Sequence, residues 1–193
     1  MTIAISFDFE CPFCRRFAET VDSVFGNGGE DLRVVFHHLP LSMHKWARVA
    51  AEGAACAQLQ SSQAFWVIHD NLFRNQETIT IDNVKQRLRD YASASAQIDR
   101  KAFETCLDNG MSIGLILRDL KLAEAYEVNG TPTLFINGRR LPGVQNAAEL
   151  EQLINATRGS GDAGSITPVH AAEHDAPSCM SGKHPKWHRP RQL

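Results

Sequence analysis

Two cysteines with two residues between them, Cys11 and Cys14, are the side chains of this sequence best suited to chemistry. They stand in the run Cys-Pro-Phe-Cys, whereas the three other cysteines of the chain are isolated. In a chain of 193 residues, one such pair indicates either thiol–disulfide exchange or half of a metal site. A structural zinc site needs a second pair of ligands, and none stands at that spacing. We therefore interpret the pair as redox-active and predict no metal site.

The pair also stands at the start of a predicted helix, where unpaired amide groups and the helix dipole stabilise a thiolate. Cys11, at the N-terminal edge, is expected to be the exposed nucleophile, with a pKa in the range of about 3.5–7.5 that such sites produce. Cys14, one turn further on, is expected to be buried and to resolve the mixed disulfide. Pro12 suits its early helical position because it lacks an amide hydrogen. Phe13 is expected to be exposed and to contact the substrate.

The segments around the pair predict a β-α-β unit. Residues 2–9 alternate apolar and small or polar side chains, which indicates a strand. Residues 15–25 carry apolar side chains at helical spacing, and residues 32–36 indicate a second strand. The cysteines therefore lie at a strand-to-helix junction, in a crossover that normally makes the two strands parallel.

A block with helical periodicity follows over residues 43–127, in five stretches, the last of which is expected to end at Asn129-Gly130. Cys56 and Cys106 lie within this block. We expect each of them to fill a helical face as a small apolar side chain. A second disulfide across the block is the alternative.

The C-terminal part predicts a hairpin, a helix and a tail. Residues 133–141 indicate two strands joined by a two-residue turn at Asn137-Gly138. Asn146 and Glu149 have the spacing of a capping box that opens a last helix. Residues 158–193 are rich in Gly, Ser, Pro, Ala and His and poor in large apolar side chains, so they are predicted to be a disordered tail.

Thr131-Pro132 comes just before the first of these C-terminal strands. On frequency alone the bond would be trans, because only about 5–6% of X–Pro bonds are cis. After a β-α-β unit with Cys-x-x-Cys, however, Pro132 resembles the cis-proline that faces the cysteine pair in thioredoxin folds. A proline there leaves neighbouring backbone groups free to pair with an extended substrate, so Thr131 and Pro132 are predicted to bind substrate.

The whole of residues 2–157 resembles the DsbA-like branch of the thioredoxin superfamily. The resemblance implies an α/β thioredoxin fold with an all-helical inserted domain. Residues 1–41 and 129–157 would form the two halves of the fold, and residues 42–128 the insertion. Four motifs carry the resemblance, in order: Phe7–Arg16 around the cysteine pair, Phe36–Leu41 followed by Met43-His44, Ala64–Phe73, and Gly130–Gly138.

The resemblance also implies an activity and partners. The chain would be a thiol–disulfide oxidoreductase without a bound cofactor, in which Cys11 attacks, Cys14 resolves and Pro132 is the cis-proline. Its partners would be protein or peptide thiols and disulfides, with glutathione as a candidate small thiol, and a redox recycling partner that the sequence does not identify.

Two departures from the family pattern bear on the chemistry. Phe13 stands where DsbA has His, which removes a donor to the thiolate and predicts a less oxidising couple. Ile5 stands six residues before the first cysteine, where many thioredoxin-fold enzymes carry a buried carboxylate. The proton of Cys14 must therefore pass to water or another group, and Asp8 and Glu10 are considered only as secondary candidates.

Four histidines, His37, His38, His44 and His69, are expected to occupy surface or satisfied polar positions. His44 is also considered, with Met43, as a residue at the rim of the active site.

Composition and the N-terminal residues limit the function classes and the cellular location that we expect. A net charge of −2 argues against a nucleic-acid-binding surface. No run of about 18 apolar residues is present, so no membrane span is expected. Met1–Ile5 lacks the features of a secretory signal, so a cytoplasmic location is expected, and a periplasmic one only if a leader is missing. In the cytoplasm the pair would be largely reduced.

Two other functions remain open. A kappa-type glutathione transferase or isomerase shares the fold and the helical insertion, but it typically uses a serine-centred site, and the presence of both Cys11 and Cys14 counts against it. A metal-binding protein could combine the cysteine pair with the tail, which holds two pairs of histidines at i,i+4 spacing. The prolines and glycine of the tail argue against the helix that this spacing needs.

Overall fold

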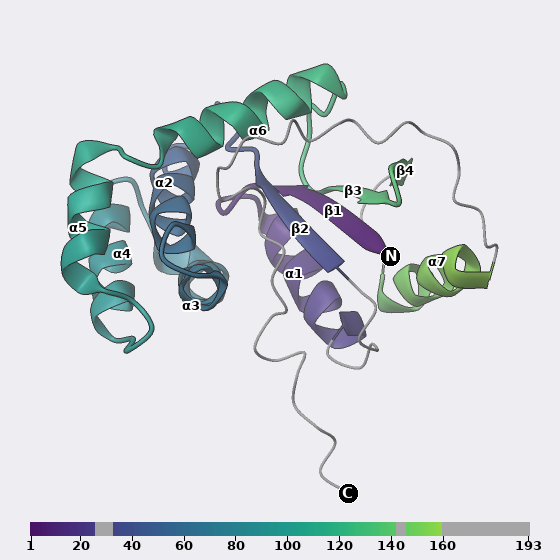
Figure 1. Cartoon of the computed structure of the whole chain (residues 1–193), viewed down its shortest axis with the longest axis horizontal. Coiled ribbons are helices and arrows are strands. Elements are labelled where there is room, and N and C mark those ends of the chain that lie inside the picture. The colour runs from purple at the N-terminus through teal and green to yellow at the C-terminus, as the bar shows by residue number, and fades with distance from the viewer. Residues whose placement is uncertain (26–32, 142–145, 160–193) are drawn as a thin grey trace, which may run out of the picture.

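A four-stranded mixed sheet forms the centre of the molecule (Figure 1). The computed structural model describes residues 1–25, 33–141 and 146–159. The spatial order of the strands is β2-β1-β3-β4, with β1 parallel to β2 and antiparallel to β3, and β3 antiparallel to β4. This arrangement confirms the predicted β-α-β and β-β units. The strands are β1 (Thr2–Phe7), β2 (Arg33–His38), β3 (Thr133–Ile136) and β4 (Arg139–Leu141).

β1 ends two residues earlier than the alternation of side chains predicts. Asp8 turns the chain, because its backbone carbonyl accepts a hydrogen bond from the Cys11 N–H at 3.2 Å. Its carboxylate accepts another from the Glu10 N–H at 2.7 Å. The alternation continues to Phe9, which is buried in the core, but the backbone has already left the ladder in order to enter the helix that carries the cysteines.

Helices cover both faces of the sheet. Ile3, Ile5 and Phe7 of β1 belong to the main core, together with apolar side chains of α1 (Pro12–Phe25), α3 (Ser62–Arg74) and α7 (Ala147–Gly159). A smaller cluster holds Phe135 of β3 against α6 (Ile113–Ala125). Strands of the sheet therefore pack against helices in both clusters.

The helical block lies between β2 and β3 in the chain, as predicted. Figure 1 shows α2 to α5 grouped beside the sheet and α6 running from that group across it. α6 ends at Ala125, before the predicted Asn129-Gly130, because Glu127 adopts a positive φ of 52° and the Val128 N–H bonds back to the Ala123 carbonyl at 2.8 Å. The remaining elements of the block are α2 (Ala47–Gln58), the short 3-10 helix η1 (Gln76–Thr78), α4 (Val84–Ser93) and α5 (Arg100–Asn109).

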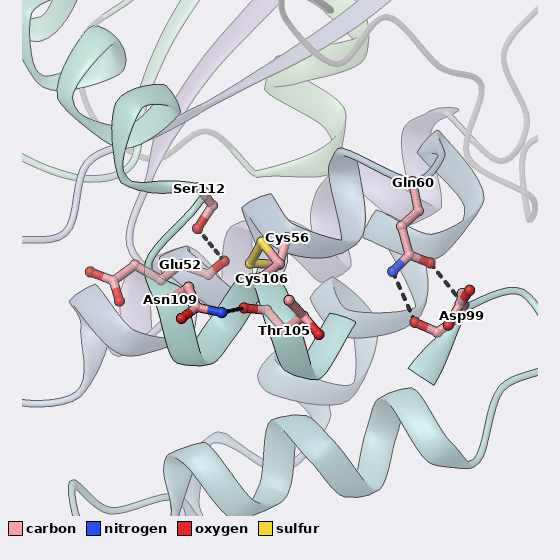
Figure 2. Close-up of a disulfide and its surroundings, with 8 residues drawn as sticks. All are labelled: Glu52, Cys56, Gln60, Asp99, Thr105, Cys106, Asn109 and Ser112. Carbon is pink, nitrogen blue, oxygen red and sulfur yellow. Dashed lines mark hydrogen bonds between the residues drawn. A yellow bond between two sulfur atoms is a disulfide. The ribbon is translucent and has the colours of Figure 1, made fainter. Parts of the chain in front are cut away.

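Cys56 and Cys106 form a disulfide that joins α2 to α5 (Figure 2). The prediction that they are separate apolar side chains is therefore wrong, although both are buried. Spacing within each helix shows which face is apolar, but it does not show which two faces meet. On one side of the disulfide, Gln60 and Asp99 exchange two hydrogen bonds, of 2.8 and 3.1 Å.

The C-terminal signals are confirmed in detail. Asn137 and Gly138 both have positive φ, 48° and 84°, as a tight hairpin turn requires. Asn146 and Glu149 exchange hydrogen bonds of 3.0 and 3.1 Å and form the predicted capping box at the start of α7. Most of the predicted tail, residues 160–193, lies outside the described residues. Within the described part of the chain, no helix has the length and apolar character to cross a membrane.

Candidate active site

Cys11 immediately precedes α1, at the end of the turn that Asp8 makes. Its side chain and that of Cys14 are free thiols. Cys11 is only 4% exposed, so the expectation of an exposed nucleophile is wrong. The segment before β3 covers it, because the carbonyl oxygen of Thr131 lies 3.4 Å from its Sγ.

The Thr131–Pro132 peptide bond is cis, as the resemblance implies. Both residues are half-buried, and the Thr131 carbonyl places them beside Cys11. The base rate for X–Pro bonds alone would have given the wrong isomer. The two predicted substrate-binding residues of this segment therefore lie next to the nucleophile, although they are distant from it in sequence.

The pKa values of the two thiols are shifted in opposite directions. The hydrogen bond with the Cys14 side chain does most to lower the pKa of Cys11, which falls from 9.0 to about 5 although burial opposes it. Smaller contributions come from the Thr131 side chain and from the backbone N–H groups of Cys14 and Phe13. Burial raises the pKa of Cys14 well above its ordinary range, and the neighbouring Cys11 raises it further. These shifts favour a thiolate at Cys11 and a thiol at Cys14 at neutral pH.

Asp8 and Glu10 have bonding roles that their sequence positions did not reveal. The Asp8 carboxylate is fully buried and lies 2.7 Å from Nδ1 of His44. The Glu10 carboxylate accepts hydrogen bonds from the backbone N–H groups of Trp46 and Ala47, at 2.6 and 3.0 Å. Glu10 thus caps the first turn of α2 from a distant part of the chain, and it joins the active-site turn to the helical block.

Gln76 is the residue of the site that sequence reasoning missed. It lies in η1 and is 8% exposed. Its side-chain amide donates to the carbonyl oxygens of Phe9 at 2.7 Å and Cys11 at 3.0 Å. These bonds hold the backbone at two positions of the turn that leads into α1. No local pattern marks a glutamine 65 residues away as a partner of this turn.

The surface beside the cysteines is apolar and basic. Phe13 is 51% exposed, which confirms the prediction for this side chain. The Arg16 guanidinium lies 4.8 Å from the centre of the Phe13 ring, and Arg15 pairs with Glu77 at 2.6 Å. Contact of Phe13 with a substrate stays a prediction, and the ring is exposed to solvent.

The described residues contain no group of three or more His, Cys, Asp or Glu side chains placed to hold a metal ion. The histidine pairs on which the metal-binding alternative depends lie in residues 160–193, outside the described part of the chain.

Comparisons with known proteins agree with this geometry. The thioredoxin family model matches residues 1–156. Among solved structures, DsbA2 of Pseudomonas aeruginosa is 27% identical, with a TM-score of 0.59 over 81% of this chain and 87% of that chain. A periplasmic thioredoxin-like protein of Salmonella enterica serovar Typhimurium is 24% identical, with a TM-score of 0.61 over 80% of this chain and 82% of that one.

The curated relatives are much longer than this chain. The Na(+)/H(+) antiporter NhaA 1 of Mycolicibacterium gilvum is 33% identical over 153 residues, which are 79% of this chain and 24% of the antiporter. The chain thus spans about a quarter of the length of the curated relatives it matches.

Proposed function

Because the chain belongs to the DsbA-like branch of the thioredoxin superfamily, we propose that it exchanges disulfides with protein or peptide substrates through Cys11 and Cys14. The observation that carries this proposal is the difference in pKa between the two thiols, which lie beside the cis peptide bond. Cys11 has a pKa of about 5, whereas burial raises that of Cys14. The thiolate is the nucleophile in such exchange, so Cys11 attacks first, and Cys14 stays protonated during this step.

In the reductive direction the reaction has two exchanges. The Cys11 thiolate attacks a substrate disulfide, forms a mixed disulfide and releases one substrate sulfur as a thiolate, which takes up a proton. Cys14 then loses its proton and attacks Sγ of Cys11, so that the Cys11–Cys14 bond forms and the second substrate sulfur leaves. Two electrons pass from the cysteine pair to the substrate. The oxidative direction is the same sequence reversed, and no cofactor takes part.

The cis-proline segment supports an extended substrate. Thr131 and Pro132 are half-buried, and the backbone carbonyl of Thr131 lies 3.4 Å from Sγ of the nucleophile. An extended peptide can pair with such a backbone while its own sulfur reaches Cys11. Phe13, which lies between the two cysteines in the chain, exposes an apolar ring that we propose as a further contact. We therefore propose a peptide or an unfolded protein segment as the substrate.

An oxidising compartment fits this chain better than the cytoplasm that its sequence led us to expect. The cytoplasmic expectation finds no support in the comparisons, since the similar Salmonella protein is named as periplasmic. The disulfide between Cys56 and Cys106 is of a kind that persists mainly outside reducing compartments. The name Na(+)/H(+) antiporter describes the whole of each longer relative, and this chain matches about a quarter of it. For this chain we propose only the exchange that its own residues support.

Exchange with a peptide disulfide tests the proposal. The reduced wild-type chain should reduce the peptide, Cys11→Ser should abolish the reaction, and Cys14→Ser should stop it at a mixed disulfide with Cys11 that mass spectrometry detects. An inactive wild-type chain would overturn the proposal. Glutathione transfer to an electrophile that survives in Cys14→Ser would instead favour a kappa-type transferase.

A further inference from the structure

Asp8 connects the two cysteines through its backbone. Its N–H donates to Sγ of Cys14 at 3.5 Å, and its carbonyl oxygen accepts from the N–H of Cys11 at 3.2 Å. Asp8 therefore contacts the sulfur of Cys14, but only the backbone of Cys11. Its orientation depends on what holds its side chain.

The Asp8 side chain is held by three donors. One carboxylate oxygen accepts from the Glu10 N–H at 2.7 Å. The other accepts from the Leu41 N–H at 2.7 Å and from Nδ1 of His44 at 2.7 Å. Because backbone N–H groups already donate to both oxygens of this carboxylate, we assign Nδ1 of His44 as a further donor to it. His44 belongs to the turn between β2 and α2, and it is 19% exposed while the carboxylate is fully buried.

We propose that His44 is a positioning residue for the resolving step: it holds the Asp8 carboxylate, and thereby keeps the Asp8 N–H directed at Sγ of Cys14. This inference rests on the proposed function and assigns a role to a histidine that touches neither cysteine. Sequence reasoning had expected His44 only at a satisfied polar position or at the rim of the site.

The resolving step is where this N–H has an effect. The Cys14 thiol must give up its proton before its sulfur attacks Sγ of Cys11, and burial makes that loss unfavourable. A backbone N–H directed at the sulfur stabilises the thiolate that forms, because hydrogen bonds to charged groups are stronger than neutral ones. The first exchange starts from the Cys11 thiolate, which has its own partners, and is therefore expected to depend little on His44.

Substitutions at position 44 are feasible because the residue does not lie in the packed core. His44 lines a cavity of about 290 Å³ between the β2–α2 turn and α6. His44→Phe keeps a ring but removes the donor. His44→Asn retains an N–H near the position of Nδ1. As a matched control, His37→Phe removes another histidine–aspartate pair, that of His37 with Asp119, at 3.2 Å and similar burial, on the strand β2.

The two steps can be timed separately. A peptide whose cysteine carries 5-thio-2-nitrobenzoate loses that coloured thiolate when Cys11 attacks, which reports the first exchange. Acid quenching and mass spectrometry then follow the decay of the Cys11–peptide disulfide as Cys14 displaces the peptide thiol. We expect His44→Phe to slow this decay about tenfold with the first exchange changed less than about twofold. His44→Asn should recover most of the rate, and His37→Phe should match the wild type.

Three results would overturn the inference. Decay at the wild-type rate in His44→Phe would show that the residue has no role in resolution. Equal slowing of both exchanges, or equal slowing in His37→Phe, would indicate loss of structure alone. These outcomes differ from a failure of the proposed function, because in that case the wild-type chain would release no coloured thiolate.

Discussion

The Sγ of Cys11 lies 3.4 Å from the carbonyl oxygen of Thr131, although 120 residues separate them in the chain. Cys11 follows β1 and Thr131 precedes β3, and these two strands pair antiparallel in the sheet. The whole helical block is inserted between them. The sheet thus brings the sulfur of Cys11 against the segment whose backbone we propose to bind the substrate.

The first prediction concerns the acidity of Cys11. In the reduced chain, ultraviolet absorbance of the thiolate should show one transition near pH 5, and Cys11→Ser should remove it. Because the pKa of Cys11 is lowered from 9.0 to about 5, its thiolate stabilises the folded reduced chain. This contribution is complete above about pH 9 and is lost as the pH falls toward 5. A transition near pH 9 would contradict the assignment.

Gln76 should contribute more to the free energy of unfolding than an exposed glutamine does. Gln76→Leu leaves two buried carbonyl oxygens, of Phe9 and Cys11, without their side-chain donor. We expect the free energy of unfolding to fall by about 2 kcal/mol in denaturant titrations. Gln86→Leu is the control, because the Gln86 amide bonds an exposed Asp90 and its loss should cost less than about 0.5 kcal/mol. Equal effects in the two variants would refute the role given to Gln76.

The disulfide between Cys56 and Cys106 should stabilise the helical block without taking part in exchange. It closes a loop with a sequence separation of 50, so replacing both cysteines by Ser should lower the free energy of unfolding by about 4 kcal/mol. Strong reductant should lower the wild-type value to that of the double variant and leave the variant unchanged. Loss of peptide exchange in a folded double variant would show that the disulfide has a further role.

His38 should make stability depend on pH. Its ring is fully buried and packs against Phe7 and Phe65, and this burial lowers its pKa from 6.5 to about 4. The unfolded chain therefore binds a proton that the folded chain does not. Stability is complete above about pH 6.5 and falls by at most about 1.4 kcal/mol per pH unit down to pH 4. His38→Phe should flatten this slope in denaturant titrations at each pH, and an unchanged slope would exclude His38 as its cause.

Local signals predicted those parts of the structure that depend on neighbours in sequence. The cysteines at a helix start, the turn at Asn137-Gly138 and the capping box of Asn146 with Glu149 each follow from the backbone preferences of a few adjacent residues. The cis bond before Pro132 needed the family resemblance, because the local preference of an X–Pro bond is trans.

Tertiary contacts account for what was missed. Cys11 is covered because another part of the chain lies over it, Cys56 and Cys106 pair because two helix faces meet, and Gln76 reaches the active-site turn from the helical block. Each of these depends on how elements pack, and a single sequence carries no periodicity or motif that records it. His44 is intermediate: its type suggested a place near the site, but only the structure shows its bond to Asp8.

The reduction potential of the cysteine pair tests the central claim most directly. The chain is equilibrated against a series of glutathione ratios, alkylated, and digested so that mass spectrometry reads each cysteine separately. We predict one two-electron transition in which Cys11 and Cys14 change together, at a potential between about −120 mV for DsbA and about −270 mV for thioredoxin, with Cys56 and Cys106 oxidised throughout that range. If Cys11 and Cys14 pair at no glutathione ratio, the chain is not a thiol–disulfide oxidoreductase.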